Sequence, residues 1–525
     1  MITLSSAALP QVESPDLQTP DYDLAGRQVG IVHFGVGGFH RAHQALYLDR
    51  LFNAGHPPQW AVCGVGLMPG DAAMRDALTP QDGLYTLVAK APDGTREARV
   101  VGSIAEYLYA PDDPAAVLER LTDPAVRIVS LTVTEGGYNY NPSTGEFQHS
   151  TPAIAADLTA DFSRAELQSQ GVWPRGGPDQ ETVEAPPQFP ATMFGFVVEA
   201  LRRRRAQGIP AFTVLSCDNV RGNGDLARRV ITAYAERKDN QSHEEQLAGW
   251  IAEHVAFPNT MVDRITPVTS EEDRAMVRRD YGIDDAWPVV SEDFLQWVVE
   301  DHFPAGRPAF EEAGAQLVAD VEPYELMKLR LLNCSHQAIA YLGLLLGYTY
   351  AHEAVQDEQL AGFTRRHYMD GEASPTVPEV PGIDLEAYKD QLMARFGNEY
   401  VRDTLARLAA ESSDRIPTWL VPVIRENLVA GRDVSVSAAI VASWARYAEG
   451  SGEKGEQWPV VDRLREQVMA AAARHDEDIL AFLRDQELFG DLVEHRAFAE
   501  PYEKALVTLR EQGARALLDN MVTER

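Results

Sequence analysis

Cysteine, positive charge and long apolar runs are all scarce in this sequence. Only three cysteines occur in 525 residues (Cys63, Cys217 and Cys334), and none belongs to a CxxC pair. This spacing argues against a disulfide framework and against a cysteine-rich zinc site. The most apolar stretch, around residues 338–345, is far shorter than the roughly 18 uninterrupted apolar residues of a membrane span. We therefore expect neither a disulfide scaffold nor a membrane protein.

Basic residues are outnumbered by acidic ones. The chain has 47 Lys and Arg against 79 Asp and Glu, which gives a formal net charge of -32. A nucleic-acid partner is disfavoured, because binding phosphates needs clustered basic side chains. The N-terminal residues show no basic segment followed by an apolar one, so no secretory signal is expected and the cytoplasm is the predicted location.

The first half of the sequence alternates short Val- and Ile-rich runs with helical patterns. Strands are predicted at 28–34, 59–67, 84–90, 126–133 and 211–216, and helices between them at 43–53, 114–121 and 197–207. Runs this apolar are typical of strands buried on both faces of a parallel sheet. The alternation predicts a doubly wound, Rossmann-type α/β domain. A Pro-, Gly- and Gln-rich stretch at 163–190 is interpreted as a surface loop.

The second half changes to a nearly all-helical pattern. Helices are predicted through 323–348 and at 385–396, 399–410, 434–449, 460–473 and 501–512. We therefore expect two domains, a Rossmann-type domain over residues 1–315 and an α-helical domain over residues 316–525. The length of the chain supports this division, because single cores rarely grow beyond about 250–300 residues.

A glycine-rich turn directly follows the first predicted long strand. It consists of Gly35, Val36, Gly37, Gly38 and Phe39. Glycines there allow backbone N–H groups to approach a pyrophosphate at the start of a helix. His40 stands where the usual fingerprint has its third glycine, so the motif taken by itself is also compatible with an ordinary glycine turn.

An acidic residue near the end of the second strand is the second feature expected of a dinucleotide site. Asp71 lies just beyond the strand 59–67. Its carboxylate can bind a ribose hydroxyl and repel a 2′-phosphate, which favours NAD over NADP. The alternative is an N-cap for a helix over 72–78.

Polar side chains gather on one side of the predicted helix 323–348. At 100° per residue, Lys328, Asn333 and His336 lie within an arc of roughly 140° that also includes Glu325. Burial lowers the pKa of a lysine from roughly 10.4, so Lys328 can take the proton of an alcohol while hydride leaves the same carbon. Asn333 can hold the developing alkoxide, and His336 can bind Lys328 or a neighbouring hydroxyl. The alternative is an exposed charged face with a hydrogen-bonded histidine.

Two other sequence patterns are associated with alcohol chemistry. Tyr324 and Lys328 form a Y-x-x-x-K pair, the spacing of short-chain dehydrogenases, but the pair lies far downstream of the glycine turn and is interpreted as coincidence. A metal site is not expected, because the sequence has no HExxH and no Cys/His cluster at zinc spacing. His40 and His43 share one helical turn without an evident third ligand.

Blocks along nearly the whole chain resemble the polyol-specific long-chain dehydrogenases. They are HFGVGGFHRAHQALYLD, CGVGL, RIVSLTVTEGGY, AFTVLSCDN, FPNTMVDRITP, GIDDAWPVV, YELMKLRLLNCSH and VPGIDLEAY. The resemblance implies a Rossmann domain followed by a helical domain, NAD as cofactor and no metal. Its K-x-x-x-x-N-x-x-H pattern matches Lys328, Asn333 and His336.

Further roles follow from the resemblance alone. It implies that Asn219 is a second holder of the reacting oxygen and that Glu325 passes the proton to solvent. Asp263, Arg407 and Arg415 are implied to contact substrate. Arg415 stands where the family pattern has a lysine, and this departure leaves the substrate open.

The expected activity is reversible oxidation of D-mannitol to D-fructose with Lys328 as base. Arabinitol, sorbitol or a sugar acid of the fructuronate or tagaturonate type are alternative substrates. A non-catalytic NAD-binding regulator is the alternative outside the enzymes. A small-molecule polyol is the expected partner, and the chain is expected to be a monomer, with a dimer as the alternative.

Overall fold

A computed structural model describes residues 1–525 except 142–144, 161, 163–188, 243–245, 454 and 524–525. The predicted loop 163–190 therefore lies almost wholly outside the described residues. The chain divides into two compact units. The α/β unit comprises Met1–Lys90 and Arg96–Val321, and the helical unit comprises Ala91–Thr95 and Glu322–Arg525. Each unit is described by itself.

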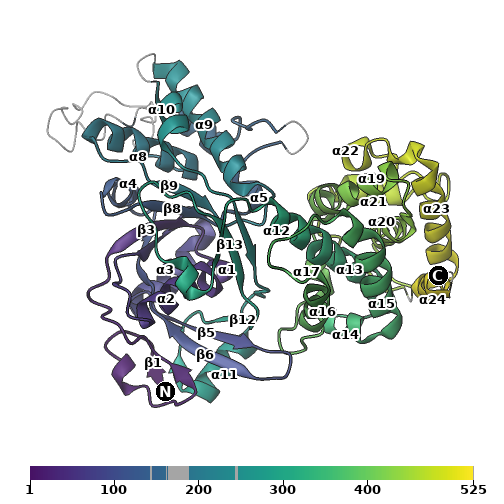
Figure 1. Cartoon of the computed structure of the whole chain (residues 1–525), viewed down its shortest axis with the longest axis horizontal. Coiled ribbons are helices and arrows are strands. Elements are labelled where there is room, and N and C mark those ends of the chain that lie inside the picture. Colours follow the sequence, from purple (N-terminus) through teal and green to yellow (C-terminus); the bar gives the residue numbers. More distant parts are fainter. Residues whose placement is uncertain (142–144, 161, 163–188, 243–245, 454, 524–525) are drawn as a thin grey trace, which may run out of the picture. The chain divides into compact units, whose positions relative to one another are not determined.

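The α/β unit is built around a five-stranded, all-parallel sheet (Figure 1). In spatial order its strands are β7 (Ile104–Tyr109), β4 (Ala61–Gly66), β3 (Val29–Phe34), β8 (Ile128–Leu131) and β9 (Thr213–Ser216). The chain runs outward from β3 in one direction to β4 and β7, and in the other to β8 and β9. The strand order therefore reverses between β3 and β8, and in such sheets ligands bind outside the carboxyl ends of the strands at this point.

Helices cover both faces of this sheet, as expected for a doubly wound fold (Figure 1). On one face Val32, Phe34 and Val129 pack against α4 (Pro114–Thr122), α8 (Met193–Gln207), α9 (Asn223–Ser242) and α10 (Leu247–His254). On the other face Ile31 and Val62 pack against α2 (Gln44–Asn53) and α3 (Ala72–Leu78). Successive strand residues thus enter two different cores, which explains the continuous apolar runs of the sequence.

The strand predicted at 84–90 does not belong to the parallel sheet. It forms β5 (Tyr85–Lys90), which pairs antiparallel with β6 (Arg96–Val101) in a separate four-stranded sheet with β12 (Val289–Glu292) and β2 (Leu17–Gln18). The sequence Pro92-Asp93-Gly94 makes the tight turn, in which Gly94 has φ +86° and Ala91 N–H donates to the Thr95 carbonyl. Asp-Gly between apolar runs is a hairpin signal, so the assignment to the parallel sheet was wrong.

The remaining elements of the α/β unit complete its surface. Two further sheets consist of β10 (Thr260–Asp263), β13 (Gln296–Glu300) and β14 (Gln316–Val318), and of β1 (Ile2–Thr3) and β11 (Ile283–Asp284). The remaining helices are α1 (Gly38–Ala42), α5 (Thr134–Gly137), α6 (Pro152–Thr159) and α11 (Glu271–Tyr281).

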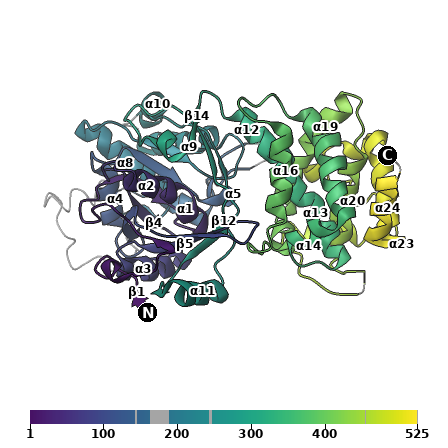
Figure 2. The ribbon, with the colours of Figure 1, turned by 60° about the horizontal axis from the view of Figure 1, so that its bottom comes forward.

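The helical unit packs its helices around a buried central pair. Figure 2 shows α13 (Cys334–Leu346), α20 (Ser435–Tyr447) and α23 (Arg496–Glu511) running side by side. Nearly every side chain of α13 and α20 is buried, so these two helices form the core of the unit. Around them lie α12 (Glu322–Met327), α14 (Ala351–Gln356), α15 (Glu358–Gly362), α16 (Leu385–Phe396), α17 (Leu405–Leu408), α18 (Ser412–Arg415), α19 (Val421–Val429), α21 (Arg465–Ala472), α22 (Gln486–Phe489) and α24 (Gly513–Thr523).

Two helix predictions in this unit need correction. The helix expected at 399–410 is reduced to α17, because Arg402 has φ +55° and Thr404 caps the helix by accepting a hydrogen bond from Arg407 N–H. The helix expected through 323–348 is interrupted by a π-helical segment at Lys328–Asn333, which separates α12 from α13, and it ends at Leu346. Within the described residues no helix is long and apolar enough to cross a membrane.

Candidate functional site

The glycine-rich turn lies at the carboxyl end of β3, beside the point where the strand order reverses. Gly35 has φ +92°, and a Cβ atom there would lie 2.1 Å from the carbonyl oxygen of Thr132. Only glycine fits this position, because both the backbone conformation and the approach of the neighbouring chain exclude a side chain. The turn continues through Val36 and Gly37 into α1, where Gly38 and Phe39 are the first residues. The cradle fits a dinucleotide pyrophosphate.

The base of this turn rests on a buried hydrogen-bond network. Thr132 Oγ1 donates to the Gly35 carbonyl at 2.7 Å, and the His33 ring bridges Thr132 Oγ1 (2.9 Å) and Ser130 Oγ (2.8 Å). His40 stacks on His33 with ring centroids 3.5 Å apart, and neither of its ring nitrogens has a hydrogen-bond partner. Burial, with a smaller contribution from His33, keeps the pKa of His40 well below 6.5.

We expect His40→Phe to change how stability depends on pH. An unfolded His40 takes up a proton below about pH 6.5, whereas the folded one stays neutral, so the wild type loses stability as the pH falls. Relative to the phenylalanine variant, this loss should be about 1.4 kcal/mol per pH unit below 6.5 and absent above it. Urea unfolding at several pH values measures it. Parallel curves for the two proteins would show that His40 protonates equally in both states.

Asp71 lies between β4 and α3 and holds the loop that joins them. Its Oδ2 accepts hydrogen bonds from the N–H groups of Leu67 and Met68, both at 2.9 Å. It occupies the N-cap position of α3, but its side chain makes no capping hydrogen bond. Tyr107 donates to the Asp71 carbonyl at 3.2 Å, so the residue is fixed from the neighbouring strand as well. The carboxylate therefore has a structural role in addition to the predicted contact with ribose.

Asn219 and Asp263 belong to neighbouring segments at the carboxyl ends of β9 and β10. Asn219 follows β9 in the sequence SCDN, and Asp263 is the last residue of β10 and only 4% exposed. Asn223 ties the segment after β9 to the opposite end of β10, because its Nδ2 donates at 2.9 Å each to the carbonyls of Asp218 and of Thr260, the first residue of β10. Arg264, the residue after Asp263, donates to the backbone carbonyls of Ala42 and Glu292.

Four of the predicted catalytic residues lie together in the helical unit. Glu325 is in α12, Lys328 and Asn333 are the first and last residues of the π-helical segment, and His336 is in the first turn of α13. All four side chains are buried, with exposed fractions between 3% and 9%. The alternative of an exposed charged face is therefore wrong. Pro323 stands in the first turn of α12, where a proline is well tolerated.

The π-helical geometry changes how these residues are aligned. In an α-helix, residues five apart diverge by about 140°. A π-helix is hydrogen-bonded from residue i to i+5, so Lys328 and Asn333 lie one above the other on adjacent turns. Asn333 and His336, three residues apart at the start of the α-helix, share a face as well. Tyr368 Oη donates to the Arg330 carbonyl at 3.1 Å, which satisfies a carbonyl of the wide turn.

Cationic side chains surround His336. Burial, followed by the charges of Arg407, Arg395, Arg415 and Lys328, holds the pKa of His336 well below 6.5. The ring is therefore neutral, and its Nε2 is buried without a hydrogen-bond partner. Arg395, which no motif singled out, thus belongs to the same cluster as the two arginines predicted to contact substrate.

The two predicted substrate arginines are each held in place. Arg407 forms a bidentate ion pair with Asp403, with Nε–Oδ1 at 2.6 Å and Nη2–Oδ2 at 2.5 Å. Arg415 donates to the Leu408 carbonyl at 2.9 Å and lies over the Trp419 ring. In the rival Y-x-x-x-K pair, Tyr324 Oη donates to the Pro381 carbonyl at 2.8 Å.

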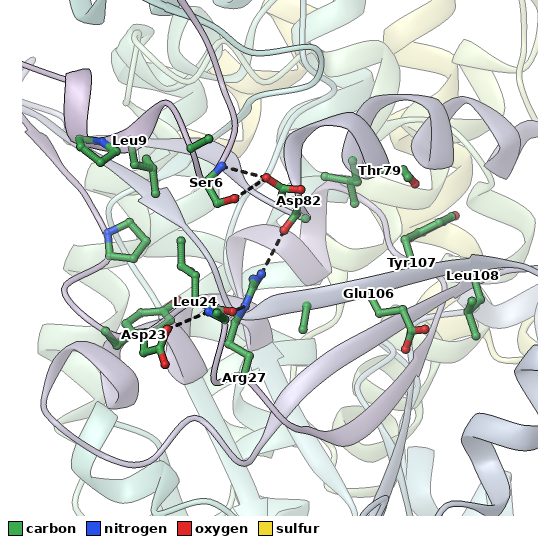
Figure 3. Close-up of a pocket in the computed structure, with 18 residues that line it drawn as sticks. Ser6, Leu9, Asp23, Leu24, Arg27, Thr79, Asp82, Glu106, Tyr107 and Leu108 are labelled. Atoms are coloured by element: carbon green, nitrogen blue, oxygen red, sulfur yellow. Dashed lines mark hydrogen bonds between the residues drawn. The ribbon is translucent and has the colours of Figure 1, made fainter.

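A cavity of about 880 Å³ lies elsewhere in the α/β unit (Figure 3). Its polar side chains are engaged with one another and with the backbone: Ser6 binds Asp82 through both N and Oγ, and Arg27 donates to the Asp82 carbonyl. None of the predicted site residues lines this cavity. Among the described residues no three His, Cys, Asp or Glu side chains gather as a metal-ligand set.

Comparison with known proteins gives matches over both units. The mannitol dehydrogenase Rossmann domain matches residues 29–312, and the mannitol dehydrogenase C-terminal domain matches residues 320–510. Together they span most of the chain. The chain therefore belongs to the mannitol dehydrogenase family.

Individual relatives are similar over nearly their full length. Mannitol 2-dehydrogenase of Pyrenophora tritici-repentis is 42% identical, with 96% of this chain and 84% of that protein covered. The solved ternary complex of Pseudomonas fluorescens mannitol 2-dehydrogenase with NAD and D-mannitol has 40% identity and a TM-score of 0.87, with both chains fully covered. A substrate-free D-sorbitol dehydrogenase has 37% identity and a TM-score of 0.82, covering 99% of this chain and all of that one.

Proposed function

We propose that this protein catalyses the reversible, NAD-dependent oxidation of D-mannitol to D-fructose. The observation that carries the proposal is the full-length similarity to a mannitol 2-dehydrogenase whose structure contains NAD and D-mannitol. The Gly35 cradle supports the cofactor, because it lies at the carboxyl end of β3 beside the switch point of the sheet, where such folds bind dinucleotides. NAD, when bound, accepts the hydride.

Lys328 is the proposed general base. Its amine, buried on the wide turn, takes the hydroxyl proton as hydride leaves the same carbon. Glu325, one turn earlier and also buried, is proposed to pass this proton to solvent. No metal is needed in this scheme, because an amine and amide donors handle the proton and the developing charge.

Asn333 is proposed to stabilise the oxygen as negative charge develops on it. Its alignment with Lys328 supports this role, because base and donor then face the same reacting group. Asn219 is proposed as a second amide donor to that oxygen. Preorganised donors of this kind act most strongly where water is excluded. The neutral ring of His336 is proposed to bind a neighbouring hydroxyl through its buried Nε2.

The choice among substrates rests on the arginines and Asp263. A sugar acid requires a cation for its carboxylate, but the Arg407 charge is already balanced by its bidentate pairing with Asp403. This arrangement favours an uncharged polyol, with Asp263 and Arg407 binding hydroxyls. Sorbitol is the second candidate because of the similarity to a D-sorbitol dehydrogenase. Arg415 stands where the family has a lysine, and its planar guanidinium offers several hydrogen-bond donors. The substrate specificity is therefore most open to change at this position.

A substrate panel tests the proposal. We expect mannitol to give the highest kcat/KM among mannitol, sorbitol, arabinitol, mannonate and altronate, followed by NADH absorbance. NAD should be preferred over NADP, because Asp71 repels a 2′-phosphate. A higher kcat/KM for sorbitol would reassign the substrate, and NADH binding without turnover of any polyol would favour the regulator. We further propose a monomer that acts in the cytoplasm.

A further inference from the structure

Asp218 is a buried carboxylate immediately before the proposed oxygen-binding Asn219. It is only 6% exposed and follows β9. Its Oδ1 accepts from Thr134 N–H at 2.8 Å, and its Oδ2 accepts from Val133 N–H at 3.1 Å and from Tyr138 Oη at 2.7 Å. All three partners lie in the turn that follows β8. Asp218 therefore joins the ends of two adjacent strands of the parallel sheet.

The turn that Asp218 binds is strained. Thr134 has φ +63°, a conformation that is costly for a β-branched residue and persists only where the surroundings impose it. Here this conformation is imposed by the consecutive N–H groups of Val133 and Thr134, which both donate to the Asp218 carboxylate. Burial raises the pKa of Asp218 to about 6, so the carboxylate is charged at neutral pH and accepts all three hydrogen bonds.

The same turn supports the glycine-rich cradle. Thr132 directly precedes the two residues bound by Asp218, and its Oγ1 donates to the Gly35 carbonyl at 2.7 Å. Its own carbonyl is the atom that a Cβ at Gly35 would meet. A shift of the turn is therefore transmitted to Gly35 through a single residue.

We propose that Asp218 is a positioning residue for the reaction of the previous subsection. It holds the turn after β8 and, with it, both the cradle at Gly35 and the segment that carries Asn219. This inference rests on the proposed function for the role of Asn219, but its link to the cradle concerns NADH binding alone. Asn223 secures the same segment from the other side, because its Nδ2 binds the Asp218 carbonyl.

Asp218→Asn tests the inference. The three partners of the Asp218 side chain all donate hydrogen bonds, and the NH2 group of an amide cannot accept them. The turn therefore loses at least one hydrogen bond in this variant. We expect NADH, titrated by its fluorescence, to bind at least tenfold more weakly. The matched control is Asp157→Asn, because Asp157 is an equally buried carboxylate that accepts from Ala191 N–H (3.0 Å) and Thr192 N–H (2.9 Å) away from the cradle. It should lower the melting temperature and leave the NADH Kd unchanged.

Thr134→Gly provides a rescue that a merely structural role would not give. Glycine adopts positive φ without strain, so adding it to Asp218→Asn should restore at least part of the lost NADH affinity. If Asp218→Asn fails to fold, Tyr138→Phe removes one of the three donors and should weaken NADH binding several-fold. An Asp218 variant, or failing that a Tyr138 variant, with wild-type NADH affinity would overturn the inference. Absence of NADH binding in the wild type would instead refute the proposed function.

Discussion

Lys328→Ala should lower kcat for mannitol oxidation by about 10²- to 10⁴-fold, the range expected when a general base is removed. The NADH Kd should change little, because the proposed role of Lys328 is to take a proton from the substrate and not to hold the cofactor. Methionine at the same position separates loss of the amine from loss of packing, since its unbranched chain fills most of the space. Single-turnover kinetics with mannitol measure the chemical step directly.

Lys389→Met is the matched control for this experiment. Lys389 is also a buried lysine of the helical unit. It is 1% exposed, and its Nζ pairs with Glu386 at 2.7 Å and with Asp370. Its replacement should lower the melting temperature, because Asp370 and Glu386 keep Arg365 but lose their second cationic partner, and should leave kcat unchanged. If Lys328→Met also keeps a near-normal kcat, Lys328 is not the base.

Asn333→Ala and Asn219→Ala should each lower kcat by about 10²- to 10³-fold, as expected when one donor to a developing oxyanion is removed. KM should change less, because the negative charge appears in the transition state rather than in the bound alcohol. If both amides bind the same oxygen, the double variant should lose less than the product of the two single losses, because residues that act as a unit are not additive.

Asn427→Ala is the corresponding control in the helical unit. Asn427 is fully buried, and its amide binds the Glu372 carbonyl at 2.9 Å and Arg432 Nε at 2.6 Å. Its loss should reduce stability without changing kcat. If Asn333→Ala lowers kcat/KM but leaves kcat unchanged, Asn333 does not stabilise the charge that develops in the transition state.

The fold was largely predictable from hydrophobic periodicity. Four of the five strands assigned to the parallel sheet are there, because their apolar side chains enter cores on both faces. The strand at 84–90 was misplaced because periodicity does not reveal the pairing partner, although Asp93-Gly94 marked the hairpin. The helix at 399–410 was overextended because its apolar spacing outweighed Asp403 and Thr404, which are typical of a helix start.

The sequence predicts which residues form the candidate site, but it does not predict how their side chains are arranged. Spacing placed Lys328, Asn333 and His336 on one side of a helix, but the π-helical turn that aligns them depends on packing, including the hydrogen bond from Tyr368. Asp218 and Arg395 were missed for another reason. A lone aspartate after a strand and a lone arginine in a helix carry no motif, and their roles appear only when distant segments are brought together.

The wide turn between Lys328 and Asn333 depends on the number of residues between them, and not only on which residues they are. Such a turn holds one residue more than an ordinary helical turn, so it is equivalent to an insertion that the surrounding helices have absorbed. Rewinding this stretch as a regular helix of the same length would rotate everything downstream, His336 included, by roughly 80° relative to the lysine, whereas losing a single residue would restore regular winding and leave the downstream faces nearly unchanged. Point changes among Leu329, Leu331 and Leu332 alter packing, whereas a one-residue deletion there would remove the wide turn itself.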